Sequence, residues 1–214
     1  MNIIQKGIKN IIFDFGGVLL NLNMQACVSA FIRLGYDKIG ELIDHYKQKG
    51  LFLLFEEGKI STDDFFTELQ KIVGLQASIE DLKQAYLSFL GDLPKHKLNL
   101  ILELRKTHKV YMLSNINQFI FEYCKKTYFE TDNHVFNDYF DKAYLSFEMG
   151  VCKPDKLIFE KMIEDAEITP NQSLFLDDGV KNIETAKNLG FHTRLVKRED
   201  DFFGLLIHFR YPIW

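Results

Sequence analysis

Acidic residues directly follow two short apolar runs of this 214-residue sequence, and a lysine follows a third run. Asp14 comes at the end of the first run, Asp177 and Asp178 come at the end of another, and Lys153 lies a few residues after the third. Carboxylates that gather in one place repel one another unless a cation lies between them. Because oxygen ligands select a hard ion, we expect this cation to be Mg²⁺.

This set of residues suits the hydrolysis of a phosphate ester. A metal ion lowers the charge on a phosphate group and bridges it to the acids. Ser114 and Asn115, which end a fourth run, would hold phosphate oxygens together with Lys153. An oxygen of Asp14 would then attack phosphorus, and water would hydrolyse the resulting aspartyl-phosphate. The lysine would also offset charge on the transferring phosphoryl group.

Each of these residues also has a purely structural interpretation. Asp14 would be a turn acid at a strand end, and the pair Asp177-Asp178 would cap the helix that follows it. The serine and asparagine would be loop or helix-cap residues, and the lysine a surface residue. None of these interpretations requires that the residues follow successive strands, and this joint placement favours chemistry.

Five short apolar runs must position these residues. Each run is continuous, which is typical of strands that helices cover on both faces. Between the last four runs lie segments of helical spacing that are long enough for crossover connections. The sequence therefore predicts a doubly wound, Rossmann-like α/β fold with a parallel sheet, which binds ligands at the carboxyl ends of its strands. The predicted strands are Asn10–Phe15, Val110–Ser114, Lys142–Ser146, Ser173–Asp177 and His192–Val196.

Residues 21–92 interrupt this pattern, because they contain no strand-like run. Ser61, followed by acids, is typical of a helix N-terminus. An all-helical insert with short connections at both ends indicates a lid over the sheet edge, and a helical domain packed elsewhere is the alternative. We therefore predict a core of residues 1–20 and 93–214 and a helical cap of residues 21–92. Its predicted helices are Met24–Leu34, Lys38–Lys49, Thr62–Val73 and Ile79–Leu90.

The composition is that of an ordinary globular protein, with 47% apolar and 26% charged residues. The net charge is −4, and the basic pairs Lys125-Lys126 and Lys197-Arg198 are too short to form a basic stripe, so we expect no nucleic-acid partner. Three widely spaced cysteines form no disulfide framework and no metal motif. We expect reduced thiols, with Cys27 in the core.

The longest apolar stretches are Leu51–Phe55 and Phe202–Phe209, well short of the ~18 residues of a membrane helix. Residues 1–9 lack the apolar region of a secretory signal. We therefore expect a cytoplasmic protein that makes no membrane contact. The aromatic segment Phe202–Trp214 is expected to pack as a last helix, or to form a dimer contact if it is exposed, so we expect a monomer or a weak homodimer.

Four segments resemble, in order and spacing, the motifs of the haloacid dehalogenase superfamily. The resemblance covers essentially the whole chain. It implies that Asp14 is the nucleophile and that the backbone carbonyl of Gly16 is a metal ligand beside Asp14 and the pair Asp177-Asp178. The four segments are Ile11–Leu19, Leu113–Asn115, Gly150–Asp155 and Phe175–Asp178.

A closer resemblance is to members of this superfamily with helical caps, which include phosphatases of glucose 1-phosphate and the phosphatase domain of some epoxide hydrolases. It implies that residues 21–92 are the cap. It also implies that the turn from Gly16 to about Asn23 opens and closes with the cap, excluding water from the substrate. The segments that carry it are Phe55–Ser61, Leu113–Asn117, Tyr144–Gly150 and Asp177–Gly190.

The sequence departs from the superfamily pattern at Gly16. Most phosphatases of the superfamily carry a second aspartate there, which acts as general acid and base. This help is typically worth ~10²–10⁴ in rate. Glu56, Glu57 or the substrate itself would have to supply the proton.

These observations leave several functions open. The first is a Mg²⁺-dependent phosphatase for a small phosphorylated metabolite such as a sugar phosphate. The second is a metal-independent 2-haloacid dehalogenase, which the pair Asp177-Asp178 disfavours because a metal-free site gains nothing from uncompensated acids. The third is a phosphate-ester-binding protein with weak catalysis, and the fourth is a mutase.

Overall fold

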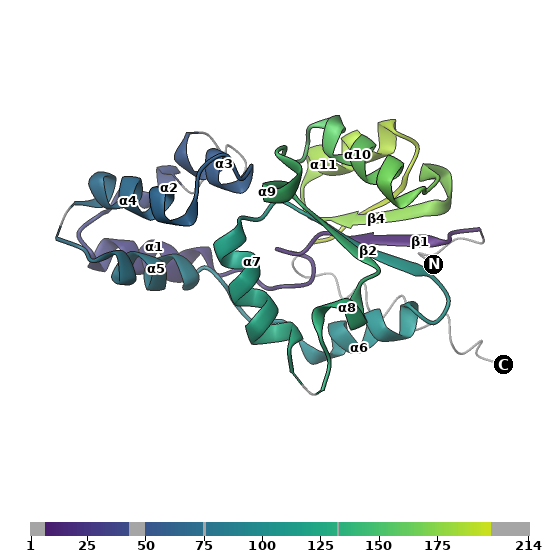
Figure 1. Cartoon of the computed structure of the whole chain (residues 1–214), viewed down its shortest axis with the longest axis horizontal. Coiled ribbons are helices and arrows are strands. Elements are labelled where there is room, and N and C mark those ends of the chain that lie inside the picture. Colours follow the sequence, from purple (N-terminus) through teal and green to yellow (C-terminus); the bar gives the residue numbers. More distant parts are fainter. Residues whose placement is uncertain (1–6, 43–49, 75, 132, 198–214) are drawn as a thin grey trace.

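The computed structural model describes residues 7–42, 50–74, 76–131 and 133–197 of the chain. Within this part, a parallel sheet of five strands has the order β3-β2-β1-β4-β5. Helices flank the sheet, and this confirms the predicted α/β fold (Figure 1). The strands are β1 (Asn10–Phe13), β2 (Lys109–Ser114), β3 (Lys142–Leu145), β4 (Ser173–Asp177) and β5 (His192–Leu195).

The strands β1 and β4 are buried along their whole length because helices cover both faces of the sheet, whereas the edge strand β5 is only part-buried. Along β1, Ile11 and Phe13 join one buried cluster, whereas Ile12 joins the cluster on the opposite face. Figure 1 shows α10 and α11 over one face and α6 and α8 over the other. These helices are α6 (Lys95–Leu104), α8 (Phe136–Tyr139), α10 (Lys156–Ala166) and α11 (Val180–Asn188).

The strand order creates a crevice beside β1. The chain runs from β1 to β2 and β3 on one side, and then returns to β4 and β5 on the other side. Such a reversal opens a ligand-binding crevice outside the carboxyl ends of the strands. Asp14, the first residue after β1, donates its backbone N–H to Leu176 O at 2.9 Å. The end of β1 and the end of β4 are thus joined where the acidic residues emerge.

The helices described between Asn21 and Asp92 form a lobe to one side of the sheet (Figure 1). The two connections to this lobe run side by side, because Asn21 N donates to Asp92 O at 2.9 Å and Gly91 N donates to Asn21 O at 2.8 Å. The lobe helices are α1 (Met24–Arg33), α2 (Ile39–Leu42), α3 (Leu51–Glu56), α4 (Thr62–Val73) and α5 (Ile79–Leu87).

Local sequence explains most of these helix boundaries. Ser61 caps α4, since its hydroxyl accepts the N–H of Asp64 at 3.1 Å. Helix α5 ends three residues earlier than predicted, and Leu90 instead pairs with Leu22 in the connections. The sequence did not indicate α3, because its run Leu-Phe-Leu-Leu-Phe lacks the polar face that marks a helix at a surface.

Helix α3 is held against the core at α9 (Ser146–Met149). The Ser146 hydroxyl lies 2.7 Å from Glu56 O, within hydrogen-bond distance. Gly58 has φ +64°, and a Cβ there would lie 2.1 Å from Phe147 O. Only glycine permits this approach of backbone to backbone. The remaining elements are α7 (Gln118–Cys124), the π-helix η1 (Lys125–Phe129) and the 3₁₀-helix η2 (Pro170–Gln172).

All three cysteines are buried free thiols, and Cys27 lies in the core as predicted. Across the described ranges, no helix combines the length and the hydrophobicity that a bilayer crossing requires. Several expectations concern residues outside the described ranges, wholly or in part; besides residues 1–6 of the predicted core, three are specific. They are the predicted helix beyond Leu42, the basic pair Lys197-Arg198, and the aromatic segment Phe202–Trp214.

Candidate active site

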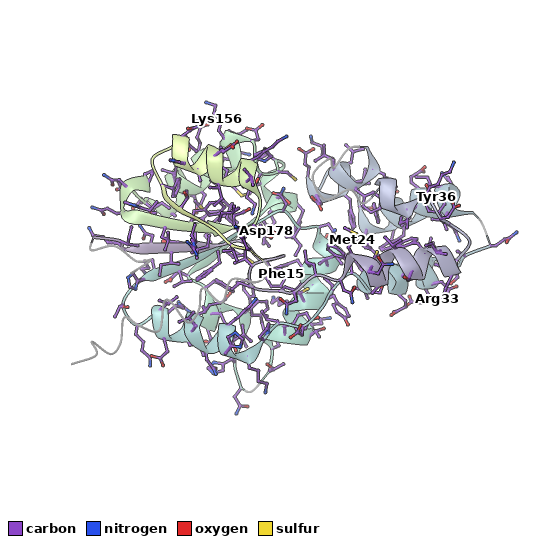
Figure 2. The ribbon with its side chains drawn as sticks, turned by 180° about the vertical axis from the view of Figure 1, so that it is seen from behind. Phe15, Met24, Arg33, Tyr36, Lys156 and Asp178 are labelled. Atoms are coloured by element: carbon purple, nitrogen blue, oxygen red, sulfur yellow. The ribbon has the colours of Figure 1, made fainter. Side chains whose placement is uncertain are left out.

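A cavity of about 1090 Å³ lies between the lobe and the carboxyl ends of β1, β2 and β4. In Figure 2, Phe15 and Asp178 lie where the lobe meets the sheet, while Arg33 and Tyr36 lie far out on the lobe. Asp14, Ser114 and Lys153 line the cavity from the sheet, and Glu56 and Tyr86 line it from the lobe. The residues predicted from the strand ends therefore share one cavity with residues of the helical insert.

Three carboxylates meet at the base of this cavity. Asp14 follows β1, while Asp177 ends β4 and Asp178 follows it. Each offers an oxygen, and these oxygens lie within 4.8 Å of one another. Burial of charges this close is costly without a compensating cation.

Lys153 provides part of this compensation. Its Nζ lies 2.9 Å from Asp14 Oδ1 and 2.6 Å from Asp177 Oδ2. It also donates to Leu113 O at 2.9 Å. An ammonium group has three protons, so all of them are engaged. Lys153 would have to exchange one of these partners to bind a substrate oxygen directly.

Burial and charge shift the titration of this group of residues. Burial, opposed by Lys153 and assisted by the charges of Asp177 and Asp178, raises the pKa of Asp14 to about 7. Burial alone would lower the pKa of Lys153, but Asp14 and Asp177 outweigh burial and raise it. Three carboxylates and one ammonium leave a net charge of −2 when all are ionised, which suits one divalent cation.

The two adjacent aspartates differ in their surroundings. Asp177 is fully buried, and its Oδ1 accepts from Gly179 N at 2.7 Å and from Asn182 Nδ2 at 2.9 Å. Asp178 lines the cavity, whereas Asp177 does not. Gly179 is the N-cap of α11, so neither aspartate is the cap that a purely structural interpretation required. Asp177 supports Lys153 and the loop, and Asp178 faces the space where a ligand would bind.

Ser114 and Asn115 lie where predicted, but they make different contacts. Ser114 is buried at the end of β2 and lines the cavity. The Asn115 side chain accepts from Lys153 N at 2.8 Å and donates to Lys153 O at 2.9 Å. It therefore clamps the backbone of Lys153. Asn117, and neither of these two, is the N-cap of α7.

Two glycines allow the turn after β1 to approach the acids. At Gly16, an added Cβ would lie 3.3 Å from a methyl carbon of Leu22. The place where an acid–base side chain would begin is therefore already lined by leucine. Gly17 has φ +77°, and a Cβ there would lie 2.1 Å from Asp178 Oδ2. Any larger residue at this position would displace that carboxylate.

Sequence reasoning did not assign a role to three supporting residues. Asn182 holds Asp177, Ser146 accepts the N–H of Ile116 at 2.9 Å, and Asn117 donates to Tyr86 Oη at 2.9 Å. Asn117 had a local signal, because asparagine before a helical run is a common N-cap. The other contacts join segments that are distant in the sequence or depend on a particular loop conformation.

Comparisons with known proteins match most of this chain. The family model described as haloacid dehalogenase-like hydrolase matches residues 8–190. A D-ribitol-5-phosphate phosphatase from Bacteroides thetaiotaomicron is 43% identical over 87% of this chain and 90% of its own length.

Solved structures resemble the fold over nearly the whole chain. A HAD family enzyme from Bacteroides thetaiotaomicron, an aspartate-to-alanine mutant in complex with magnesium and inorganic phosphate, superposes with a TM-score of 0.90 at 37% identity, covering 93% of this chain and 98% of that one. An L-2-haloacid dehalogenase from Xanthobacter autotrophicus reaches a TM-score of 0.62 at 20% identity, covering 94% of this chain and 81% of that one. At this identity, the likeness extends to the fold alone.

Proposed function

Because the chain belongs to the haloacid dehalogenase-like hydrolase family, we propose that it is a Mg²⁺-dependent phosphatase of a small phosphorylated metabolite, acting through an aspartyl-phosphate on Asp14. The observation that carries this proposal is the group of three carboxylates around Lys153 at the base of a large cavity. A related phosphatase acts on D-ribitol 5-phosphate, so phosphorylated polyols and sugars are the first substrates to test.

The donors at the base of the cavity fit a hard divalent cation. All of them are oxygens, and their net charge is −2 when they are ionised with Lys153. Asp14, Asp178 and the carbonyl of Gly16 would hold the ion, with Asp177 in support through Lys153. When bound, Mg²⁺ would stabilise negative charge on the phosphoryl oxygens. A metal-free dehalogenase would have no use for this excess of negative charge.

Asp14 is oriented for attack by two donors. Its Oδ1 accepts from Phe15 N at 2.7 Å and from Lys153 Nζ at 2.9 Å, and these contacts fix the plane of the carboxylate. Attack by an Asp14 oxygen would form a bond to phosphorus and break the ester bond, releasing an alcohol. Water would then attack the same phosphorus, releasing inorganic phosphate and the free carboxylate. Ser114 and Lys153 would stabilise the transferring group.

The leaving alcohol needs a proton that residue 16 does not supply. Gly16 has no side chain, and Leu22 lines the adjacent space. Glu56 and Glu57 line the same cavity, and together with water and the substrate they are the remaining sources. We propose that turnover proceeds without the usual general acid, with a slower release of alkyl alcohols as the consequence.

Residues 21–92 form the cap of the proposed enzyme. The paired connections at Asn21 and Asp92 and the contact between α3 and α9 support this division. The Lys97 ammonium donates to Val18 O at 2.7 Å, which fixes the turn between β1 and the cap. Such a cap would exclude water during the reaction and provide the residues that select the substrate.

Removal of the metal is expected to abolish hydrolysis. Dialysis against EDTA should remove activity toward D-ribitol 5-phosphate and a chromogenic phosphate ester, and added Mg²⁺ should restore it. Since the ion binds the folded site, Mg²⁺ at 100 times its Kd should stabilise the fold by about 2.7 kcal/mol, measured by thermal denaturation. Asp178→Asn should weaken both the recovery of activity and the thermal stabilisation by Mg²⁺.

Two outcomes would contradict the proposed function. Undiminished hydrolysis after removal of the metal would exclude the role of Mg²⁺. Chloride release from 2-haloacids without metal, with no hydrolysis of any phosphate ester, would favour the dehalogenase instead.

A further inference from the structure

The wall of the cavity opposite the carboxylates carries a buried tyrosine that the proposed phosphoryl transfer does not use. Tyr86 lies on α5, is only 6% exposed and lines the cavity. Aromatic rings of α3, α4 and α7 fix the position of its ring. They are Phe52, Phe65, Phe66 and Phe119, with ring centroids 5.7–6.4 Å from that of Tyr86.

The hydroxyl proton of Tyr86 is available for a ligand. Asn117 Oδ1 accepts from Ile120 N at 3.0 Å as the cap of α7, so the amide group must present its Nδ2 to Tyr86. This Nδ2 donates to Tyr86 Oη at 2.9 Å. The phenol therefore accepts in this bond and keeps its own proton to donate. Among the residues that the structure describes, none accepts this proton.

The charge around Tyr86 keeps it a donor. Burial, and then the negative charge of Glu56, raise the pKa of Tyr86 well above its ordinary value against the smaller effect of Asn117. The phenol is therefore protonated at neutral pH. A buried donor on a residue that lines a cavity favours ligands that bring an acceptor to it.

The charges at the two ends of the cavity restrict the ligand further. Lys153 and the proposed cation attract phosphate at the base, whereas Glu56 and Glu57 make the lobe end acidic. Lys59 Nζ lies 2.7 Å from Glu57 Oε2 and compensates part of the negative charge of Glu57. A second anionic group at the lobe end would be repelled, but a neutral hydroxyl group would not. Apolar side chains that suit a carbon chain also line the cavity; they include Leu22, Phe52, Phe89 and Leu90.

We propose that Tyr86, oriented by Asn117, donates a hydrogen bond to a hydroxyl group of the substrate and so selects monophosphates with a neutral, hydroxylated carbon chain. This inference rests on the proposed phosphatase function and extends it to the substrate class. Monophosphates with an unsubstituted alkyl chain, or with a carboxylate at the far end, are the esters that this arrangement disfavours.

The test compares D-ribitol 5-phosphate with pentyl phosphate, which has the same chain length and no hydroxyl groups. The quantity measured is the ratio of the two kcat/KM values, because the ratio cancels any loss of correctly folded enzyme. Tyr86→Phe removes only the hydroxyl, and we expect it to lower this ratio by about tenfold. Tyr144→Phe is the matched control: Tyr144 is also a buried tyrosine, bonded to Asp165 and outside the cavity lining. Its ratio should stay within about twofold of the parent ratio.

A second variant tests the orientation by Asn117. Asn117→Asp keeps an oxygen for the cap of α7 but presents an acceptor to Tyr86, which would then donate to residue 117 instead of the substrate. We expect the ratio to fall in this variant as well. An unchanged ratio in Tyr86→Phe overturns the inference. If the parent enzyme with Mg²⁺ hydrolyses neither ester nor a chromogenic phosphate, the proposed phosphatase function is wrong, and this inference, which depends on it, is wrong as well.

Discussion

Asp14→Asn is expected to lower kcat/KM by about 10⁴-fold or more, because the amide cannot attack phosphorus at a useful rate. The variant should still fold. Lys153 keeps its contacts to Asp177 Oδ2 and Leu113 O, and the carboxyl that is lost has its pKa raised to about 7 by burial in the first place. Steady-state hydrolysis of D-ribitol 5-phosphate with Mg²⁺ measures the rate, and thermal denaturation measures the fold.

Asp165→Asn provides the matched control for this substitution. Asp165 accepts from Lys142 Nζ and from the Tyr144 hydroxyl, both at 2.6 Å, and it does not line the cavity. The same change of carboxylate to amide should therefore leave kcat/KM within about twofold. An Asp14→Asn enzyme with a tenth or more of the parent rate would exclude Asp14 as the nucleophile.

Lys153→Met is expected to reduce both activity and stability. The ammonium group is the positive partner of two buried carboxylates, and its removal leaves them uncompensated. Breaking a buried ion pair from one side costs about 3–5 kcal/mol in the free energy of unfolding. Loss of a charge that stabilises the transferring phosphoryl group should lower kcat by about 10²–10³-fold. Urea denaturation and steady-state kinetics measure the two effects.

The stability loss in Lys153→Met should depend on pH. The pKa of Asp14 is about 7 although Lys153 lowers it. Removal of the Lys153 ammonium therefore raises the pKa of Asp14 further. A carboxyl whose pKa is raised in the folded state is protonated and neutral at low pH. It destabilises the folded state as pH rises through that pKa. Without metal, the variant should thus lose more stability at pH 8 than at pH 5, and Mg²⁺ should recover part of the loss.

A surface lysine serves as the control for Lys153→Met. Lys156 lies on the core (Figure 2), and its exposed side chain forms an i,i+4 ion pair with Glu160 at 3.1 Å. Lys156→Met should change the free energy of unfolding by no more than about 0.5 kcal/mol. If Lys153→Met behaved in the same way, Lys153 would not be compensating the buried acids.

The positions of the central strands were predictable from sequence because a strand that is buried on both faces appears as a short continuous run of apolar residues. A strand such as Ser173–Asp177 must be apolar until it reaches the rim, where Asp177 and Asp178 appear. The same argument located Asp14 and Ser114. Helix α3 was not predictable in this way. Its residues Phe52 and Phe55 are buried in an aromatic cluster of the lobe, so no amphipathic period marks it.

The contacts within the site were not predictable, because they depend on how distant segments meet. Asn115 was expected to hold phosphate, but its amide is engaged with the backbone of Lys153, 38 residues along the chain. Leu22 beside Gly16 and Asn117 beside Tyr86 arise in the same way from the approach of the lobe to the core. Residue type and spacing indicate which groups share a rim, whereas side-chain partners require the folded geometry.

The stereochemistry at phosphorus is the measurement that tests the aspartyl-phosphate most directly. The substrate is a phosphorothioate monoester whose phosphorus is made chiral by sulfur and two oxygen isotopes, and it is hydrolysed in water enriched in the third oxygen isotope. Transfer to Asp14 inverts the configuration once, and attack by water inverts it again. We expect net retention in the inorganic thiophosphate released by the parent enzyme. Net inversion would mean that water attacks the ester directly and that no aspartyl-phosphate forms on Asp14.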